Sequence, residues 1–284
     1  MRISASTKVA GVVGSPIGHT LSPTIHNAWI RAAGLDATYF SAEPGRGGFG
    51  EFVSAPCPPG LGHANFRGLN VTAPFKGEAL AIADRASRRA ERAGAANLLI
   101  FESGGDLSAD NTDGEGLLAA FREQAVGFDP AAGPVVILGA GGAARGAMAA
   151  FLDAGAPSVG LVNRSAGPAD DLAAEFGERV RVIWPQNLTA VLADANAIIN
   201  ATPTAPDIPM ERAAASAVIM DMVYRPLVTP FLARAQAAGL RTVDGLAMLI
   251  GQARPSFTAF FGVEPPDGDV RAKAIDYLAP EASE

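Results

Sequence analysis

At 284 residues the chain is long enough for two ordinary domains, and its formal net charge of −7 argues against nucleic acid as a partner. A single cysteine, Cys57, excludes an internal disulfide, and no apolar run approaches the roughly 20 residues of a membrane span. We therefore expect a soluble cytoplasmic protein, a monomer or a homodimer, with no membrane partner. The histidines, His19, His26 and His63, lack the neighbours of a metal site, so we expect no metal.

The first predicted strand, residues 9–14, leads into a helix that should begin at Ser22. Ser22 followed by Pro23 is typical of a hydroxyl N-cap with proline in the first turn. Free amide groups at this helix start, beside the hydroxyls of Thr20 and Ser22, would suit a carboxylate. A purely structural cap is the alternative for Ser22.

Short hydrogen-bonding side chains recur at the ends of the next predicted strands, residues 38–42, 66–71 and 95–101. Between the first two of these strands, the Gly/Pro-rich residues 44–62 give no clear prediction. The hydrogen-bonding side chains at these strand ends are Asn70, Thr72, Asn97 and Asn111. Short amides and hydroxyls of this kind suit a small polyhydroxylated ligand.

Two polar turns predict an acid/base site. Lys76 follows a strand in a turn of apolar and uncharged residues, and Asp113 lies in a second turn, NTDGEG. A lysine that exchanges protons near neutral pH must be partly desolvated and electrostatically partnered. Asp113 could hold the ammonium, so that the pair shares a proton. The alternative for Lys76 is a solvated surface lysine.

A second unit of alternating strands and helices begins after the Gly/Pro-rich residues 127–134, which predicts an α/β fold. The apolar strand 135–138 runs directly into GAGGAARG and then a helix to Leu152. Gly139, Gly141 and Ala144 fit the G-x-G-x-x-G/A fingerprint, in which glycines make the turn and admit a pyrophosphate. The position of the motif between strand and helix predicts a dinucleotide site.

The next strand, residues 159–162, ends at Asn163, Arg164 and Ser165. A fold that prefers NAD usually has an acidic residue there, whereas an arginine favours the 2′-phosphate of NADP. An ordinary surface arginine is the alternative. Two further strands follow, 197–200 with the turn ATPT that contains Thr202, and 218–222 with Tyr224 after it.

The last segment, from Val243, predicts a helix on which Met248 and Gln252 share a face. Both could meet a ligand, or Met248 could pack in the core while Gln252 is exposed. We expect this helix to return to the first domain and to place the ligand in the cleft between the domains. The expected domains are residues 1–112 with 243–284, and residues 113–242.

Taken together, the motifs resemble the shikimate dehydrogenase family over nearly the whole chain. The motifs that show the resemblance occur in the family's order and at its spacing: GSPIGHTLSPTIHN, GLNVTAPFK, AANLL, NTDGEG, GAGGAA, NRS, INATP, DMVY and GLAMLIGQA. The resemblance implies a three-layer α/β/α substrate domain with a mixed sheet, followed by a Rossmann-type NADP-binding domain. It also implies reduction of 3-dehydroshikimate to shikimate with NADPH, in aromatic amino-acid biosynthesis.

By the same resemblance, Lys76 and Asp113 are the catalytic pair. Thr20 and Ser22, with Tyr224 nearby, would hold the substrate carboxylate. The ring hydroxyls would meet Asn70, Thr72, Asn97, Asp113 and Gln252. The cofactor residues would be Gly139, Ala140, Gly141, Gly142 and Ala143 for the pyrophosphate, Asn163, Arg164 and Ser165 for the adenosine phosphate, and Thr202, Met222, Gly245 and Met248 towards the nicotinamide.

Several departures from the family pattern define the alternatives. Thr20 replaces a serine, which suggests quinate as a second substrate. Gly167 and Pro168 stand where a second basic residue is expected, which suggests use of NAD as well as NADP. Ala205 and Pro206 replace a Gly-Met pair, as in a divergent paralogue. A ligand sensor without turnover is the alternative of another class, although such a protein needs no Lys-Asp pair.

Overall fold

The computed structural model describes residues 3–45, 47–54 and 65–278. Cys57, His63 and part of the Gly/Pro-rich stretch lie outside these ranges. The chain forms two compact units, the first from Met1–Thr112 with Gln252–Glu284 and the second from Asp113–Gly251. In the described residues no helix is both long and apolar enough to cross a membrane.

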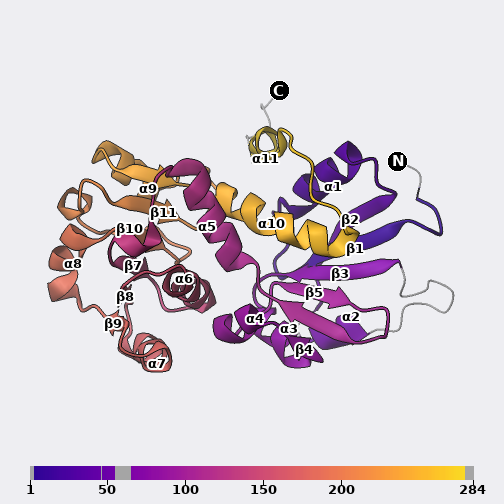
Figure 1. The fold of residues 1–284 in the computed structure, drawn as a ribbon, viewed down its shortest axis with the longest axis horizontal. Coiled ribbons are helices and arrows are strands. Elements are labelled where there is room, and N and C mark those ends of the chain that lie inside the picture. The colour runs from indigo at the N-terminus through magenta and orange to yellow at the C-terminus, as the bar shows by residue number, and fades with distance from the viewer. Residues whose placement is uncertain (1–2, 46, 55–64, 279–284) are drawn as a thin grey trace. The chain divides into compact units, whose positions relative to one another are not determined.

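The first unit is built on a mixed six-stranded sheet of order β2-β1-β3-β5-β6-β4 (Figure 1). Its strands are β1 (Lys8–Val13), β2 (Ala37–Ala42), β3 (Phe66–Val71), β4 (Arg85–Ala86), β5 (Leu98–Phe101) and β6 (Leu107–Asp110). Its helices are α1 (Ser22–Ala32), α2 (Phe49–Ser54), α3 (Lys76–Ile82), α4 (Arg88–Ala93), α11 (Val270–Leu278) and the second half of α10 (Gly245–Phe261). β1 is parallel to β2 and β3, while β5 is antiparallel to β3 and β6.

The alternation of β3 separates the two faces of this sheet. Leu69 and Val71 pack with Phe49 and Phe75 from the side of α2 and α3. Asn70 points to the opposite face, where its amide contacts Ser256 of α10. Because side chains alternate along a strand, β3 contributes apolar side chains to one face of the sheet and the polar side chain of Asn70 to the other. The result is the three-layer arrangement expected for this domain.

The second unit is built on a six-stranded parallel sheet of order β12-β11-β10-β7-β8-β9. Its strands are β7 (Val135–Leu138), β8 (Val159–Val162), β9 (Val180–Val182), β10 (Ala197–Asn200), β11 (Val218–Asp221) and β12 (Arg241–Val243). Its helices are α5 (Asp113–Gln124), α6 (Gly142–Asp153), α7 (Ala166–Phe176), α8 (Leu188–Asp194) and α9 (Pro230–Ala237), with short 3-10 turns at Pro130–Ala132, Pro185–Asn187 and Met210–Arg212. This strand order is that of the Rossmann fold, and it reverses between β7 and β10.

Both faces of the parallel sheet are covered, as its apolar strands require. Val135 and Ile137 pack with residues of α5, α6 and α7, whereas Val136 and Leu138 pack with residues of α8 and α9. A ligand is therefore excluded from both faces and is expected at the carboxyl ends of the strands.

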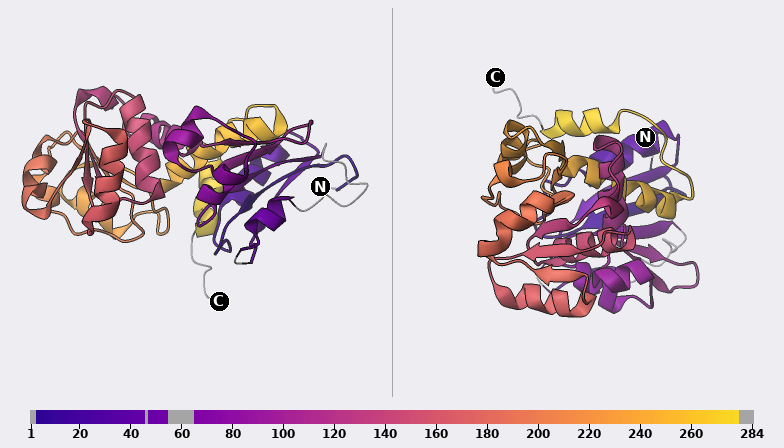
Figure 2. Two further views of the ribbon diagram at one scale, coloured as in Figure 1. Left: turned by 90° about the horizontal axis from the view of Figure 1, so that it is seen from below. Right: turned by 60° about the vertical axis from the view of Figure 1, so that its left-hand side comes forward.

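The chain returns to the first unit through α10, as expected. Residues 245–251 of this helix belong to the second unit and residues 252–261 to the first. Val243 is paired with Met220 in the parallel sheet, so residues 243–251 lie with the second unit, whereas we expected them in the first domain. Figure 2 shows that the first and last described segments, indigo and yellow, lie in the same unit.

Candidate active site

The hydroxyls of Thr20 and Ser22 contact each other at the start of α1. Thr20 Oγ1 lies 3.2 Å from Ser22 Oγ and accepts the backbone N–H of Ser22 at 3.3 Å. The prediction that Ser22 is the N-cap was wrong. The cap position is Leu21, whose helical dihedral angles start the helix one residue earlier, and no side chain caps it. Thr20 supplies the local hydroxyl acceptor instead, and Ser22 is buried as the first helical residue.

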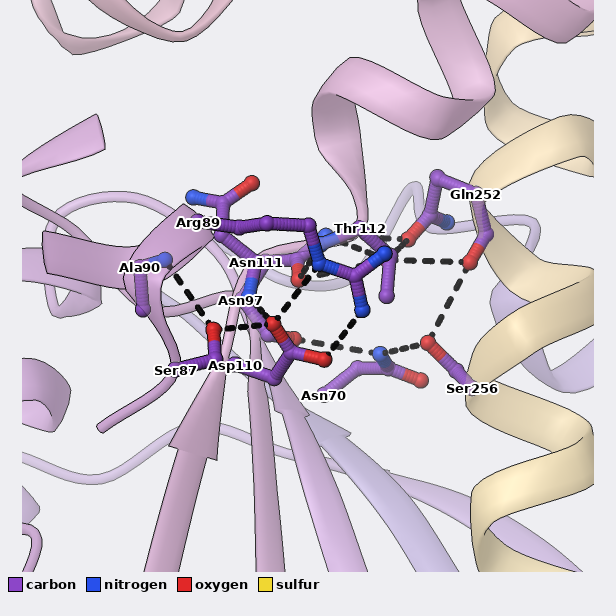
Figure 3. Close-up of polar contacts among 10 residues, drawn as sticks. All are labelled: Asn70, Ser87, Arg89, Ala90, Asn97, Asp110, Asn111, Thr112, Gln252 and Ser256. Atoms are coloured by element: carbon purple, nitrogen blue, oxygen red, sulfur yellow. Dashed lines mark hydrogen bonds and ion pairs between the residues drawn. The ribbon is translucent and has the colours of Figure 1, made fainter. Parts of the chain in front are cut away.

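A network of neutral polar side chains joins β3, the segment before β5, the end of β6 and α10 (Figure 3). Asn97 Nδ2 donates to Thr112 Oγ1 at 3.0 Å and to Gln252 Oε1 at 3.2 Å. Asn97 Oδ1 accepts the Thr112 N–H at 2.8 Å, and Asn70 Nδ2 donates to the Asn97 carbonyl at 3.1 Å. All four side chains are buried. Gln252 is therefore not the exposed residue of the alternative interpretation.

A charged group borders this network at the end of β6. Asp110 accepts hydrogen bonds from Ser87 and from the guanidinium of Arg89, and from the Asn111 N–H at 2.7 Å. Burial alone would raise the pKa of the Asp110 carboxyl, but these hydrogen bonds bring the pKa below its ordinary value. Asn111 Nδ2 donates to the carbonyl of Ala95 at 2.8 Å. Asn111 thus ties together the loops that carry Asn97 and Thr112.

The two members of the predicted acid/base pair each begin a helix. Lys76 is the first residue of α3, half-buried, and its carbonyl accepts the Ala96 N–H at 2.8 Å, next to Asn97. Thr72 precedes it at the end of β3, where its N–H donates to the Val13 carbonyl at 2.9 Å. Asp113 is the first residue of α5, in the second unit. Helix starts favour a carboxylate such as that of Asp113 through the helix dipole.

Tyr224 also lies in the second unit, three residues after β11. It is half-buried, and burial raises the pKa of its phenol. A neutral phenol is a hydrogen-bond donor and suits a carboxylate acceptor. Within the described residues, no group of three His, Cys, Asp or Glu side chains is arranged to hold a metal ion.

The GAGGAA turn lies where the strand order of the parallel sheet reverses. Gly139 has a φ of 112°, and a Cβ there would lie 3.0 Å from Thr202 Cγ2. Gly141 and Gly142 face open space, and the exposed Ala143 follows them in the first turn of α6. Ala144 is fully buried between α6 and the sheet. The backbone at this helix start is thus exposed, and the start of a helix favours an anion.

Arg164 lies in the turn that follows the neighbouring strand. Leu138 pairs with Val162, so the Gly139 turn and the turn at Asn163, Arg164 and Ser165 are adjacent at the carboxyl edge of the sheet. Asn163 Nδ2 donates to the Ser165 carbonyl at 2.8 Å, which shapes the turn and leaves Arg164 exposed. In Rossmann folds this is the position that meets the adenosine ribose.

Residues of the predicted nicotinamide side meet at the ends of β10 and β11. Thr202 Oγ1 donates to Asn200 Oδ1 at 2.7 Å, and Asn200 Nδ2 donates to the buried Asp221 at 3.0 Å. Burial raises the pKa of the Asp221 carboxyl. A Cβ on Gly245 would lie 2.5 Å from the Met222 carbonyl, so only glycine permits this approach of α10 to β11. Met222 and Met248 are half-buried against the same apolar core, as are Ala140 and Ala201.

Two protein-family models and many known proteins match this chain. The model described as "Shikimate dehydrogenase substrate binding domain" matches residues 12–99, and the model described as "Shikimate / quinate 5-dehydrogenase" matches residues 124–246. A shikimate dehydrogenase (NADP(+)) of Caulobacter vibrioides is 53% identical, over 97% of this chain and 98% of that protein. The chain belongs to the shikimate dehydrogenase family.

Solved structures of the shikimate dehydrogenase family have the same fold. The Thermus thermophilus enzyme in complex with shikimate matches with a TM-score of 0.83 and 33% identity, covering 95% of this chain and 99% of that one. The same enzyme in complex with NADP(H) and shikimate gives a TM-score of 0.81 and 31% identity, over 95% and 98% of the two chains. The resemblance and the two-domain α/β fold predicted from the sequence are thereby confirmed.

Sequence reasoning missed several residues that hold the predicted site residues. Ser256 lies four residues after Gln252 on α10, and this spacing could have indicated it. Thr112 lies inside the NTDGEG turn, next to Asp113, the residue that was predicted to be catalytic. Tyr39 lies within β2 and gave no local signal, whereas Asp221 lies in the DMVY motif without a role of its own being predicted.

Proposed function

We propose that this protein interconverts shikimate and 3-dehydroshikimate, with NADP as the redox partner. The observation that carries the proposal is the pairing of two features in one chain of this family. One is the network of buried neutral amides and hydroxyls in the first unit, which suits a small polyol. The other is the anion-accepting turn of a Rossmann fold in the second unit.

The proposed chemistry divides between proton transfer by the protein and hydride transfer by the cofactor. When bound, NADP⁺ supplies the acceptor for the hydride that leaves the substrate carbon. Lys76 takes the proton of the reacting hydroxyl as the carbonyl forms, and returns it in the reverse direction. Asp113 holds the Lys76 ammonium and accepts a hydrogen bond from the substrate.

The remaining site residues bind and orient the ligands in this proposal. The hydroxyls of Thr20 and Ser22, with Tyr224, hold the substrate carboxylate. Asn70, Thr72, Asn97 and Gln252 meet ring hydroxyls. The backbone from Gly139 to Ala143 receives the pyrophosphate, Asn163 to Ser165 the adenosine phosphate, and Thr202, Met222, Gly245 and Met248 border the nicotinamide. The lone cysteine of the sequence fits a reducing compartment, and we propose the cytoplasm.

The decisive assay follows NADPH absorbance with shikimate and NADP⁺. Lys76→Ala should lower kcat by roughly 10²- to 10⁴-fold with little change in the KM for shikimate, because proton transfer is needed mainly in the transition state. The matched control is Lys273→Ala, which removes an exposed lysine of α11 and should keep wild-type rates. A Lys76→Ala enzyme with most of its activity would remove this residue from the mechanism.

The cofactor preference is tested by Arg164→Ala. The variant should raise the KM for NADP⁺ roughly tenfold or more and leave the KM for NAD⁺ nearly unchanged, because only NADP⁺ carries the 2′-phosphate. Arg181→Ala, at another exposed arginine of the second unit, should change neither value. Equal losses with both cofactors for Arg164→Ala would contradict a phosphate contact.

Quinate is the second candidate substrate, because Thr20 carries a methyl group beside the hydroxyl that contacts Ser22. The same assay with quinate, in the wild type and in Thr20→Ser, separates the two substrates. A higher ratio of shikimate to quinate turnover in Thr20→Ser would assign the preference to this methyl group.

A further inference from the structure

The side-chain amide of Asn70 is held in one orientation by three buried neighbours. Its Nδ2 donates to the Asn97 carbonyl at 3.1 Å and to Ser256 Oγ at 2.8 Å, and its Oδ1 accepts from the Tyr39 hydroxyl at 2.7 Å. A backbone carbonyl can only accept, so the nitrogen of the amide must face Asn97. Both N–H bonds of Asn70 are therefore occupied, and one acceptor site remains on Oδ1.

Tyr39 is itself fixed on every side. Its ring stacks on His26 with the ring centroids 4.0 Å apart and 6° between the planes. Its backbone is bound by the side chain of Asn27, with hydrogen bonds of 2.8 Å and 3.1 Å. Tyr39 is 3% exposed, and burial raises the pKa of the phenol well above its ordinary value. The hydroxyl thus stays protonated and donates to Asn70.

Ser256 holds the other side of the amide. It is fully buried on α10, accepts from Asn70 Nδ2, and donates to the Gln252 carbonyl one turn earlier at 3.2 Å. Figure 3 shows Ser256 directed from the helix towards Asn70. With its proton directed to Gln252, Ser256 can only accept from Asn70, which reinforces the orientation set by Asn97.

We propose that Tyr39 and Ser256 are positioning residues that fix Asn70 as a hydrogen-bond acceptor for a substrate hydroxyl. The inference rests on the proposed function and deepens it. In this orientation Asn70 Oδ1 can accept a hydrogen bond from a ring hydroxyl of the substrate. It rejects a carboxylate or a carbonyl oxygen, which would need a donor. Neither positioning residue need touch the substrate.

The test is Tyr39→Phe, which keeps the ring on His26 and removes only the hydroxyl. Without this donor Asn70 keeps its two contacts through Nδ2, but Oδ1, the atom that would meet the substrate, loses the hydrogen bond that holds it in place. The KM for shikimate should rise roughly tenfold, the usual effect of one hydrogen bond made equally in the ground and transition states. The kcat and the KM for NADP⁺ should stay within twofold. Tyr277→Phe, at an exposed tyrosine of α11, is the matched control and should leave every constant unchanged.

A double-mutant cycle separates positioning from a general effect on folding. In an Asn70→Ala background, Tyr39→Phe should add nothing to the KM for shikimate, because the group on which it acts is gone. Ser256→Ala gives an independent variant if Tyr39→Phe folds poorly, and should also raise this KM several-fold. The inference is overturned if Tyr39→Phe leaves the KM unchanged, or if its effect persists without Asn70. No turnover of shikimate by the wild type would instead refute the proposed function.

Discussion

At the scale of single residues, the buried His26 makes stability depend on pH. Its neighbours are the uncharged rings of Trp29, Tyr39, Phe257 and Phe260, and neither ring nitrogen has a hydrogen-bond partner among the described residues. Burial lowers the pKa of His26 to about 3 from an ordinary 6.5. Below pH 6.5 the His26 imidazole is therefore protonated in the unfolded chain but stays neutral in the folded protein until the pH approaches 3. The unfolding free energy is therefore highest above pH 6.5 and decreases as the pH falls from 6.5 towards 3, because protonation then favours the unfolded chain.

Urea unfolding at pH 6.5 and pH 5 measures this effect. The wild type should lose about 2 kcal/mol more unfolding free energy over this interval than His26→Phe, which cannot titrate and keeps an aromatic ring in place. His19→Gln, at an exposed histidine, should behave like the wild type. Parallel losses in the wild type and His26→Phe would show that His26 is protonated in the folded protein.

At the scale of elements, the turn between β7 and α6 depends on Gly139. Alanine there would meet the left-handed φ of 112°, with its Cβ 3.0 Å from Thr202 Cγ2 and 3.3 Å from the Ala201 carbonyl. Gly139→Ala should cost about 1–3 kcal/mol of unfolding free energy and weaken NADP⁺ binding at least tenfold. Gly146→Ala, within α6 and facing open space, should stabilise the protein by up to about 1 kcal/mol. Urea unfolding and calorimetric titration with NADP⁺ measure both, and unchanged binding by Gly139→Ala would contradict this role of the turn.

The elements that could be predicted from the sequence are those with local signals. The strand of β7 is four consecutive apolar residues and its turn is a run of glycines, so both were predictable. β12 has only three residues, and its place in the second unit depends on its pairing with β11 rather than on a local pattern. The expected domain boundary at residue 243 therefore fell inside this strand. The contacts of Asn70 join residues 31 and 186 positions away, and no local pattern reports them. The site residues could be named by resemblance, but their supports required the fold.

At the scale of the whole molecule, each unit has its own core, and most of the residues proposed for each ligand lie in one unit. NADP⁺ alone should therefore slow amide hydrogen exchange in β7 and the first turn of α6, while shikimate alone should slow exchange from β3 to the polar network. Mass spectrometry of peptides from protein with one ligand at a time measures this division. Protection of both units to the same extent by either ligand would show that the two cores do not respond separately.

The interleaved path of the chain also bears on its synthesis. The second unit has its full sequence once residue 251 has left the ribosome, because its segment is continuous. The first unit stays incomplete until α10 has emerged in full, since Phe257 and Phe260 of this helix complete the cluster around His26. Until then the side of the mixed sheet that α1 covers lacks α10, so the first unit is completed only after the whole second unit has been made.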